Sequence, residues 1–152
     1  MEELLALLKE RGLTIGSCES LTAGLFTTQL AAVSGASAVL KGGIVTYQTA
    51  VKEQVVGVDH HVIAQDGVIS ASCAVEMARK AKELLACDIC VSFTGNAGPD
   101  VMEGKPVGRV YCAIAYQERV HTYELQLSGS RNEIRMQAVM RMNAELIRLI
   151  QK

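Results

Sequence analysis

The chain has 152 residues, of which 49% are hydrophobic and 20% are charged, and its formal net charge is −1. This length and composition predict one globular domain with a buried core. Because the net charge is close to zero, no general positive field attracts nucleic acid or anionic lipid. No apolar run reaches the length of a membrane span or forms the core of a signal peptide. We therefore expect a cytoplasmic protein with no nucleic-acid or membrane partner.

Helical and strand patterns of apolar residues alternate along the chain. Apolar residues that recur every three or four positions predict helices, whereas continuous or alternating apolar runs predict strands. Helices are expected at residues 2–11, from the junction at Ser20 to about Val33, at 49–56 and 70–85, and from about 131 to the C-terminus, with a turn or a helix at 59–65. Strands are expected at residues 13–18, 39–47, 89–93, 109–116 and 120–127.

Glycine and hydroxyl residues divide these elements. Gly12 is expected to end the first helix, Thr49 to cap the short helix that follows it, and Ser70 to cap the longest helix of the middle region. The paired glycines Gly42 and Gly43 lie inside the second strand, where they indicate a bulge or a close approach of another backbone.

The order of the elements predicts an α/β fold. Strands that alternate with helices favour a three-layer α/β/α arrangement around a mixed, mostly parallel sheet. The strand at 89–93 is almost continuously apolar, as expected when both faces are buried. The strands at 109–116 and 120–127 are joined by a short turn, and the second alternates between apolar and polar residues, which predicts a C-terminal antiparallel hairpin.

The five cysteines and three histidines do not indicate a metal site. The cysteines lie in or beside apolar runs, where free cysteines usually serve as small core residues. His60 and His61 are adjacent, so their side chains point in different directions, and His121 has no partner at ligand spacing. We expect no metal, no redox pair and no cofactor.

Residues 17–24 mark the junction between the first strand and the following helix. The first amides of a helix lack internal partners and carry a partial positive charge. A hydroxyl at this point, from Ser20 or Thr22, would therefore lie near donors that can stabilise an oxyanion. The alternative is that Ser20 or Thr22 is a helix N-cap, the more common role of these residue types.

Polar segments also follow the next two strands of the expected parallel set. Ligands of open α/β sheets bind beyond the carboxyl ends of the strands. Lys52 follows Tyr47 by five residues at such an end, and a partly buried lysine near a serine loses its proton readily and can act as a base. The alternatives are a solvated helix residue for Lys52 and a core-edge residue for Tyr47.

Two segments have features of an anion site. The glycines at both ends of the loop 95–98 let backbone amides turn towards an anion, although a tight loop needs glycines for geometry as well. Arg131 and Arg135 lie four residues apart at the expected start of the last helix. Cations oppose the helix dipole there, which favours an anionic partner such as phosphate; the alternative is a solvated helix face.

Taken together, these segments resemble the CinA C-terminal domain family. Each motif is weak alone, but five occur in the family's order and spacing from about residue 3 to the end. The motifs are Cys18-Glu19-Ser20-Leu21-Thr22-Ala23-Gly24, Val45-Thr46-Tyr47 with Lys52, Thr94-Gly95-Asn96-Ala97-Gly98-Pro99, Lys105-Pro106-Val107-Gly108 and Ser128-Gly129-Ser130-Arg131.

The resemblance implies a single CinA C-terminal-like amidase domain over residues 1–152. It implies hydrolysis of the carboxamide of nicotinamide mononucleotide, with Ser20 as nucleophile, Lys52 as base and Tyr47 assisting. It also implies that this pyridine nucleotide is the small-molecule partner and that the chain forms a homo-oligomer. The residues implied in substrate binding are Glu19, Thr22, Thr94, Gly95, Asn96, Ala97, Gly98, Arg131 and Arg135.

Three positions depart from the family pattern: Cys18 for alanine, Ala23 for glycine and Asn96 for isoleucine. The segment between Pro99 and Lys105 is also short and lacks a run of glycines. Two other functions stay open on this evidence: a non-catalytic nucleotide-binding module of the competence- and damage-inducible type, and an amidase or esterase of another small substrate.

Overall fold

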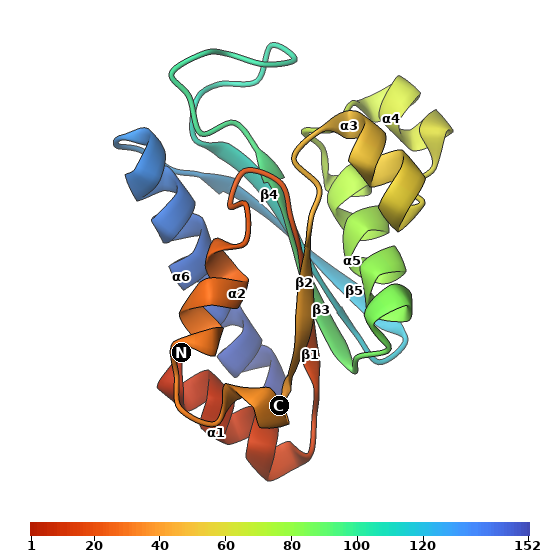
Figure 1. The fold of residues 1–152 in the computed structure, drawn as a ribbon. Coiled ribbons are helices and arrows are strands. Elements are labelled where there is room, and N and C mark those ends of the chain that lie inside the picture. Colours follow the sequence, from red (N-terminus) through yellow and green to blue (C-terminus); the bar gives the residue numbers. More distant parts are fainter.

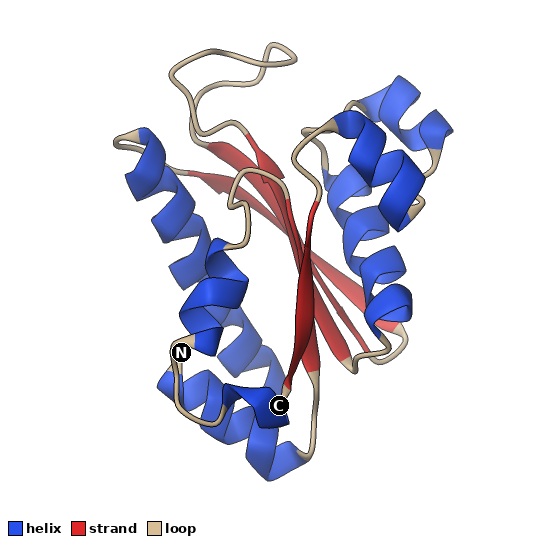
Figure 2. Cartoon of the chain, in the orientation of Figure 1, coloured by secondary structure: helices blue, strands red, loops and turns tan.

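The computed structural model describes residues 1–152 as one open sheet with helices on both faces (Figures 1 and 2). The strands, in the spatial order β2-β1-β3-β4-β5, are β1 (Ile15–Glu19), β2 (Leu40–Val45), β3 (Ile89–Gly95), β4 (Arg109–Tyr116) and β5 (Arg119–Gln126). The helices are α1 (Glu2–Arg11), α2 (Leu25–Ala31), α3 (Thr49–Val51), α4 (His60–Asp66), α5 (Ala71–Leu85) and α6 (Arg131–Ile150), with a 3₁₀ turn η1 (Ala36–Ala38) and a π-helical turn η2 (Lys52–Val56).

The sheet is mixed, as predicted. β1 pairs in parallel with β2 on one side and with β3 on the other. β4 is antiparallel to β3, and β5 is antiparallel to β4, which forms the predicted C-terminal hairpin. The three-layer α/β/α fold class is therefore confirmed.

Two helical layers bury the central strands. α1, α2 and α6 pack against one face of the sheet, and α5 packs against the other with α4 and η2 beside it (Figure 1). Every residue of β1 is buried, and so is every residue of β3 up to Thr94, in agreement with its apolar sequence. The predicted core stripe of the last helix is also buried, at Ile134, Ala138, Met142, Leu146 and Ile150.

The paired glycines of β2 mark the predicted bulge, but the atoms that approach Gly43 closely belong to side chains and not to another backbone. The register with β1 steps from Leu40 to Gly42 over one residue of β1, which is the irregularity of a bulge. A Cβ atom at Gly43 would overlap the Thr27 hydroxyl and lie 2.7 Å from Ser17 Oγ. The glycine therefore lets β2 approach the side chains of the β1–α2 unit.

The predicted helix caps are partly correct. Gly12 ends α1 in the left-handed conformation, and the Ser70 hydroxyl accepts the Cys73 N–H at 3.2 Å at the start of α5. Thr49 is not a cap, because α3 begins at Thr49 itself and Gln48 precedes it without a side-chain hydrogen bond. The helix after Ser20 is also shorter than predicted and ends at Ala31.

The cysteines are free and buried, as expected of core residues. Cys87 and Cys90 nevertheless have the Cys-x-x-Cys spacing that often marks a redox or metal pair, so the sequence alone did not exclude one. Both pack in the apolar cluster between α5 and the sheet. No three histidine, cysteine or acidic side chains are arranged to bind a metal ion, and none of the helices has the length and apolar character needed to span a bilayer.

Candidate active site

The sheet topology creates one switch point, at the carboxyl ends of β1 and β3. The chain leaves β1 for β2 on one side and later returns to place β3 on the other side. Crossover connections therefore diverge from this point, and ligands of open α/β sheets bind there. Ser20 directly follows β1, and Asn96 directly follows β3.

Ser20 and Lys52 meet at this switch point. Lys52 Nζ lies 3.0 Å from Ser20 Oγ and donates a 2.6 Å hydrogen bond to the carbonyl oxygen of Thr46. Lys52 is the first residue of η2 and is only 1% exposed. Burial lowers the pKa of its amine from the ordinary value, because the charged form loses its hydration. The predicted serine–lysine pair is thus in proton-transfer geometry.

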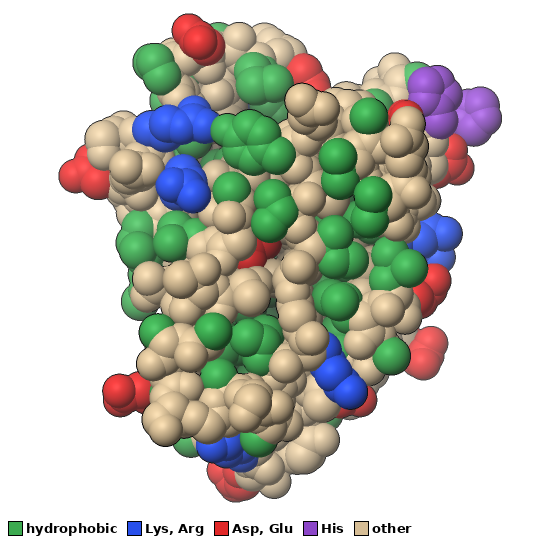
Figure 3. All heavy atoms as spheres, in the orientation of Figure 1, with side chains coloured by type: hydrophobic (Ala, Val, Ile, Leu, Met, Phe, Trp, Pro, Cys, Tyr) green, Lys and Arg blue, Asp and Glu red, His purple; other side chains and the backbone are tan.

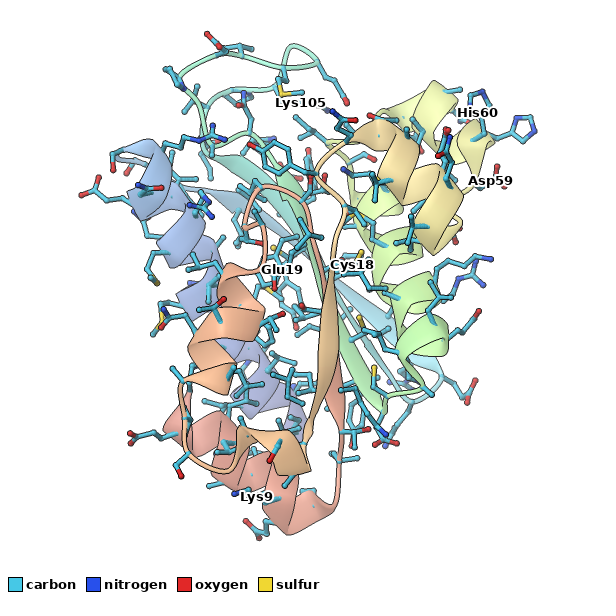
Figure 4. All side chains as sticks on the ribbon, viewed as in Figure 1. Lys9, Cys18, Glu19, Asp59, His60 and Lys105 are labelled. Carbon is cyan, nitrogen blue, oxygen red and sulfur yellow. The ribbon has the colours of Figure 1, made fainter.

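Glu19 supports the helix that follows Ser20. Its carboxylate is fully buried and accepts the N–H groups of Gly24, Phe26 and Thr27 at 3.0, 3.1 and 3.0 Å. The Thr27 hydroxyl adds a fourth donor and Ser17 a fifth. Figure 4 shows Glu19 in the interior of the molecule, beside α2.

This arrangement corrects three predictions. The amides at the start of α2 are occupied by the Glu19 carboxylate, so they are not available to an oxyanion. Neither Ser20 nor Thr22 caps α2, because its N-cap is Gly24 and the acceptor is Glu19. The implied contact between Glu19 and a substrate is also incompatible with a side chain that is fully buried and saturated with internal donors.

Other backbone amides at the switch point are free. The N–H groups of Leu21 and Ala97 have no acceptor within the protein, although both residues line the cavity beside Ser20. They follow the carboxyl ends of β1 and β3, respectively. Unpaired N–H donors on residues that line the same cavity as a nucleophile are the groups from which an oxyanion hole is built.

Arg131 and Tyr47 form the mouth of the site. Arg131 is the first residue of α6, and its guanidinium donates 2.6 Å hydrogen bonds to the Tyr47 hydroxyl and to the Gly98 carbonyl oxygen. Tyr47 is 54% exposed, so the pair lies at the surface. Figure 3 shows basic side chains next to hydrophobic ones on this upper part of the molecule.

Arg135 has a different position from that implied for it. Its guanidinium donates to the carbonyl oxygens of Leu21 and Thr22 at 2.8 and 2.9 Å, and it does not line the cavity. Arg135 therefore supports the backbone behind Ser20. Thr22 is fully buried and does not line the cavity, so its side chain belongs to the protein interior and not to the binding site.

The segment after β3 forms the opposite wall. Thr94 donates to the carbonyl oxygen of Val68 at 2.6 Å, and Asn96 accepts the Gly98 N–H at 3.1 Å through its side chain. Residues 94–97 line the cavity, whereas Gly98 does not. Gly98 contributes instead through its carbonyl oxygen, which accepts from Arg131.

The cavity between these walls has a volume of about 120 Å³. An apolar cavity of roughly 150 Å³ holds one benzene molecule, so this space suits a single aromatic ring. Leu21 and Thr49 also line the cavity, although no role in the site was predicted for them. The residues that the sequence did not single out are Val68, Ile69 and Met102, which lie outside the motifs.

Comparison with known proteins shows the family of this chain. A model of the CinA C-terminal domain matches residues 1–150. The chain belongs to the CinA C-terminal domain family. The family resemblance of the five motifs is thereby confirmed.

Relatives within the CinA family are close in sequence and structure. A competence-damage inducible protein of Shouchella clausii is 50% identical over 142 residues, which cover 91% of this chain and 34% of that protein. One of Geobacillus kaustophilus is 49% identical over 130 residues, which cover 85% and 31%, so the chain spans about a third of these relatives. A CinA superfamily protein of Klebsiella pneumoniae superposes with a TM-score of 0.96 at 27% identity, covering 98% of this chain and 94% of that one.

Proposed function

We propose that the chain is an amidase unit, formed by residues 1–152, that hydrolyses nicotinamide mononucleotide to nicotinate mononucleotide and ammonia. The observation that carries this proposal is the 3.0 Å approach of a buried lysine amine to a serine hydroxyl inside a ring-sized cavity. A serine–lysine pair is a known variant of serine-nucleophile catalysis. We also propose that the enzyme acts in the cytoplasm and needs no metal.

The first half of the reaction forms an ester with the enzyme. The neutral Lys52 amine directs an N–H to the Thr46 carbonyl oxygen, and its lone pair accepts the Ser20 proton as Oγ attacks the carboxamide carbon. The negative charge that develops on the carboxamide oxygen is stabilised by the free amides of Leu21 and Ala97. The Lys52 ammonium then returns the proton to the amide nitrogen, the C–N bond breaks, and ammonia leaves.

The second half hydrolyses this ester. Lys52, neutral again, accepts a proton from a water molecule while the water oxygen attacks the ester carbon. Collapse of the second tetrahedral species breaks the bond to Ser20 Oγ, and the proton passes back to this oxygen. The acid product releases its remaining proton to the solvent and leaves as a carboxylate, and Ser20 and Lys52 regain their starting states.

Arg131 suits the phosphate end of the substrate. The cavity accommodates the ring, so the ribose phosphate extends towards the mouth, where the Arg131 guanidinium has no carboxylate partner. Guanidinium groups bind phosphate through paired hydrogen bonds. Arg135 is held by backbone carbonyl oxygens, which leaves Arg131 as the residue for this role.

The test is an ammonia-release assay with nicotinamide mononucleotide. We expect turnover by the wild type and none by Ser20→Ala, while Ser37→Ala, which removes an exposed hydroxyl of η1, keeps full activity. Ammonia release that survives in Ser20→Ala would contradict the mechanism. Wild-type activity on other pyridine amides, with indifference to the phosphate, would favour an amidase of a different small substrate.

The names of the curated relatives refer to competence and damage, which keeps a nucleotide-binding module as the second candidate. Isothermal titration calorimetry separates the two proposals. Tight binding of the mononucleotide without turnover would favour the binding module. The homo-oligomer stays a prediction, which sedimentation of the purified chain can test.

A further inference from the structure

The loop between β3 and β4 bends back over the candidate active site. Figure 1 shows this segment rising above the carboxyl ends of the strands, and Figure 4 places Lys105 on it. Its tip is a tight turn in which Lys105 N–H donates to the Met102 carbonyl oxygen at 3.0 Å. The two central residues, Glu103 and Gly104, both have positive φ, at 52° and 65°, as type I′ turns require.

Glu103 connects this turn to the segment between α4 and α5. Its carboxylate accepts the Val68 N–H at 2.8 Å and the Ile69 N–H at 3.3 Å. These amides immediately precede Ser70, the N-cap of the 15-residue helix α5, whose positive end favours a carboxylate. A Cβ atom at Gly67 would overlap the same carboxylate, so the glycine gives Glu103 the space it needs.

The backbone of Glu103 supports a specific role for this side chain. A left-handed conformation costs a residue other than glycine roughly 1 kcal/mol, and asparagine or aspartate is the usual substitute at such a position. The turn has a glutamate there, whose longer side chain reaches the two amides. The contact with Val68 and Ile69 offsets this conformational cost.

The contact joins two parts of the cavity wall. Val68 and Ile69 line the cavity on one side, and Met102 lines it from the loop. The Val68 carbonyl oxygen also accepts a hydrogen bond from the Thr94 hydroxyl. Both backbone polar groups of Val68 are therefore hydrogen-bonded, the N–H to Glu103 and the carbonyl oxygen to Thr94. Met102 is 54% exposed, and an apolar side chain at the edge of a ring-sized cavity is suited to cover an aromatic ring.

We propose that Glu103 is a latch: its hydrogen bonds to Val68 and Ile69 hold the 102–105 turn down and place Met102 as a lid over a flat ring in the Ser20–Lys52 cavity. This inference rests on the proposed function for the identity of the ring. Glu103 is a positioning residue, because its hydrogen bonds go to Val68 and Ile69 and none goes to Ser20 or Lys52. Its negative charge also opposes the lowering of the Lys52 pKa that burial causes. Release of its carboxylate opens the lid for substrate entry and product exit.

The first test measures the latch without catalysis. Amide hydrogen exchange of Val68 and Ile69 is followed by NMR in the wild type, Glu103→Ala, Glu103→Gln and Asp100→Asn. We expect Glu103→Ala to accelerate exchange roughly tenfold, as for the loss of a charge-assisted hydrogen bond, and Glu103→Gln to have an intermediate effect. Asp100→Asn removes one charge from the same loop at an exposed side chain without a hydrogen bond, and exchange should stay unchanged.

The second test measures turnover of nicotinamide mononucleotide by the same variants. We expect Glu103→Ala to raise KM roughly tenfold and to change kcat less than about threefold, because the lid binds the ring while Ser20 and Lys52 stay in place. Two results in Glu103→Ala would overturn the latch: amide hydrogen exchange of Val68 and Ile69 at the wild-type rate, or a decrease in kcat with no change in KM. Accelerated exchange in a protein that never releases ammonia would support the latch and refute the amidase.

Discussion

Lys52 Nζ lies 2.6 Å from the carbonyl oxygen of Thr46, six residues earlier in the chain. This bond turns the amine from the start of η2 back towards the end of β2 and brings it within reach of Ser20. No carboxylate forms an ion pair with the amine, which is 1% exposed. Burial therefore lowers the pKa of this amine, which makes the neutral form, the form that a general base requires, easier to reach than in water.

The first prediction is that Lys52→Met increases stability at low and neutral pH relative to the wild type. Burial lowers the pKa of Lys52 in the folded state, so the unfolded chain binds more protons between the lowered value and the ordinary value of about 10.4. Wild-type stability should therefore rise with pH across this window, whereas methionine has no proton to lose. Each kcal/mol corresponds to about 2–4 °C in Tm for a chain of this size.

Thermal unfolding of both proteins between pH 6 and pH 10.5 measures this difference. The advantage of Lys52→Met should be greatest at the acid end and should shrink steadily towards pH 10.5. The lost hydrogen bond to the Thr46 carbonyl oxygen offsets part of this advantage. A difference that is independent of pH would show that the Lys52 pKa is not lowered by folding.

The second prediction separates the roles of Lys52 and Arg131. Lys52→Ala should reduce kcat by about 10²- to 10⁴-fold with little change in KM, because a general base acts mainly in the transition state. Arg131→Ala should raise KM by roughly tenfold or more and leave kcat nearly unchanged, because the guanidinium binds the remote phosphate equally in both states. Equal losses in both constants for both variants would contradict this division.

The third prediction concerns the pH dependence of the wild-type enzyme. kcat/KM should rise with pH as free Lys52 loses its proton, and it should level off below the ordinary lysine pKa of about 10.4. Initial rates at low substrate concentration from pH 5 to pH 10 measure the profile. A rate that is constant over this range, or that decreases with rising pH, would exclude the lysine as the base.

Most of the fold could be predicted from the sequence because periodicity and burial agree locally. The stripe from Ile134 to Ile150 at four-residue steps can be buried only along one helix face, and the alternation in residues 120–127 allows only one wet face. Gly42 and Gly43 were predicted to mark a bulge or a close approach of another backbone, and the bulge occurs in β2, while side chains come close to Gly43. Local chemistry was sufficient in these segments.

The site could be predicted only in part, because tertiary contacts determine which groups remain free. A serine after a strand and before a helix is a normal N-cap, but the Glu19 side chain competes for the same amides and leaves the Ser20 hydroxyl available. Arg131 and Arg135 look equivalent in the sequence, and only the carbonyl oxygens of Leu21 and Thr22 distinguish them. Glu103 belongs to no sequence pattern, because its partners are 34 and 35 residues away.

The fourth prediction is that Glu19→Gln destabilises the fold and impairs catalysis, although Glu19 does not touch the substrate. One carboxylate oxygen accepts from Gly24 and Phe26, and the other accepts from Thr27 and Ser17. Glutamine presents an NH₂ group to one of these sets in either orientation. This NH₂ group then faces either the N–H of Thr27 or the N–H groups of Gly24 and Phe26, whereas the Ser17 hydroxyl can rotate and accept from it. We expect a loss of about 3 kcal/mol in unfolding free energy, because buried donors are left unsatisfied.

Thr27→Val is the matched control, since it removes one hydroxyl donor and leaves the carboxylate and the three amides in place. It should cost about 1 kcal/mol, although its hydroxyl also contacts Ser17. Urea unfolding gives both values, and ammonia release at a temperature where each variant is fully folded gives the effect on kcat. Because the carboxylate holds the start of α2 next to the nucleophile, kcat should fall more in Glu19→Gln than in Thr27→Val. A folded Glu19→Gln protein with wild-type kcat would show that Ser20 is positioned without help from α2.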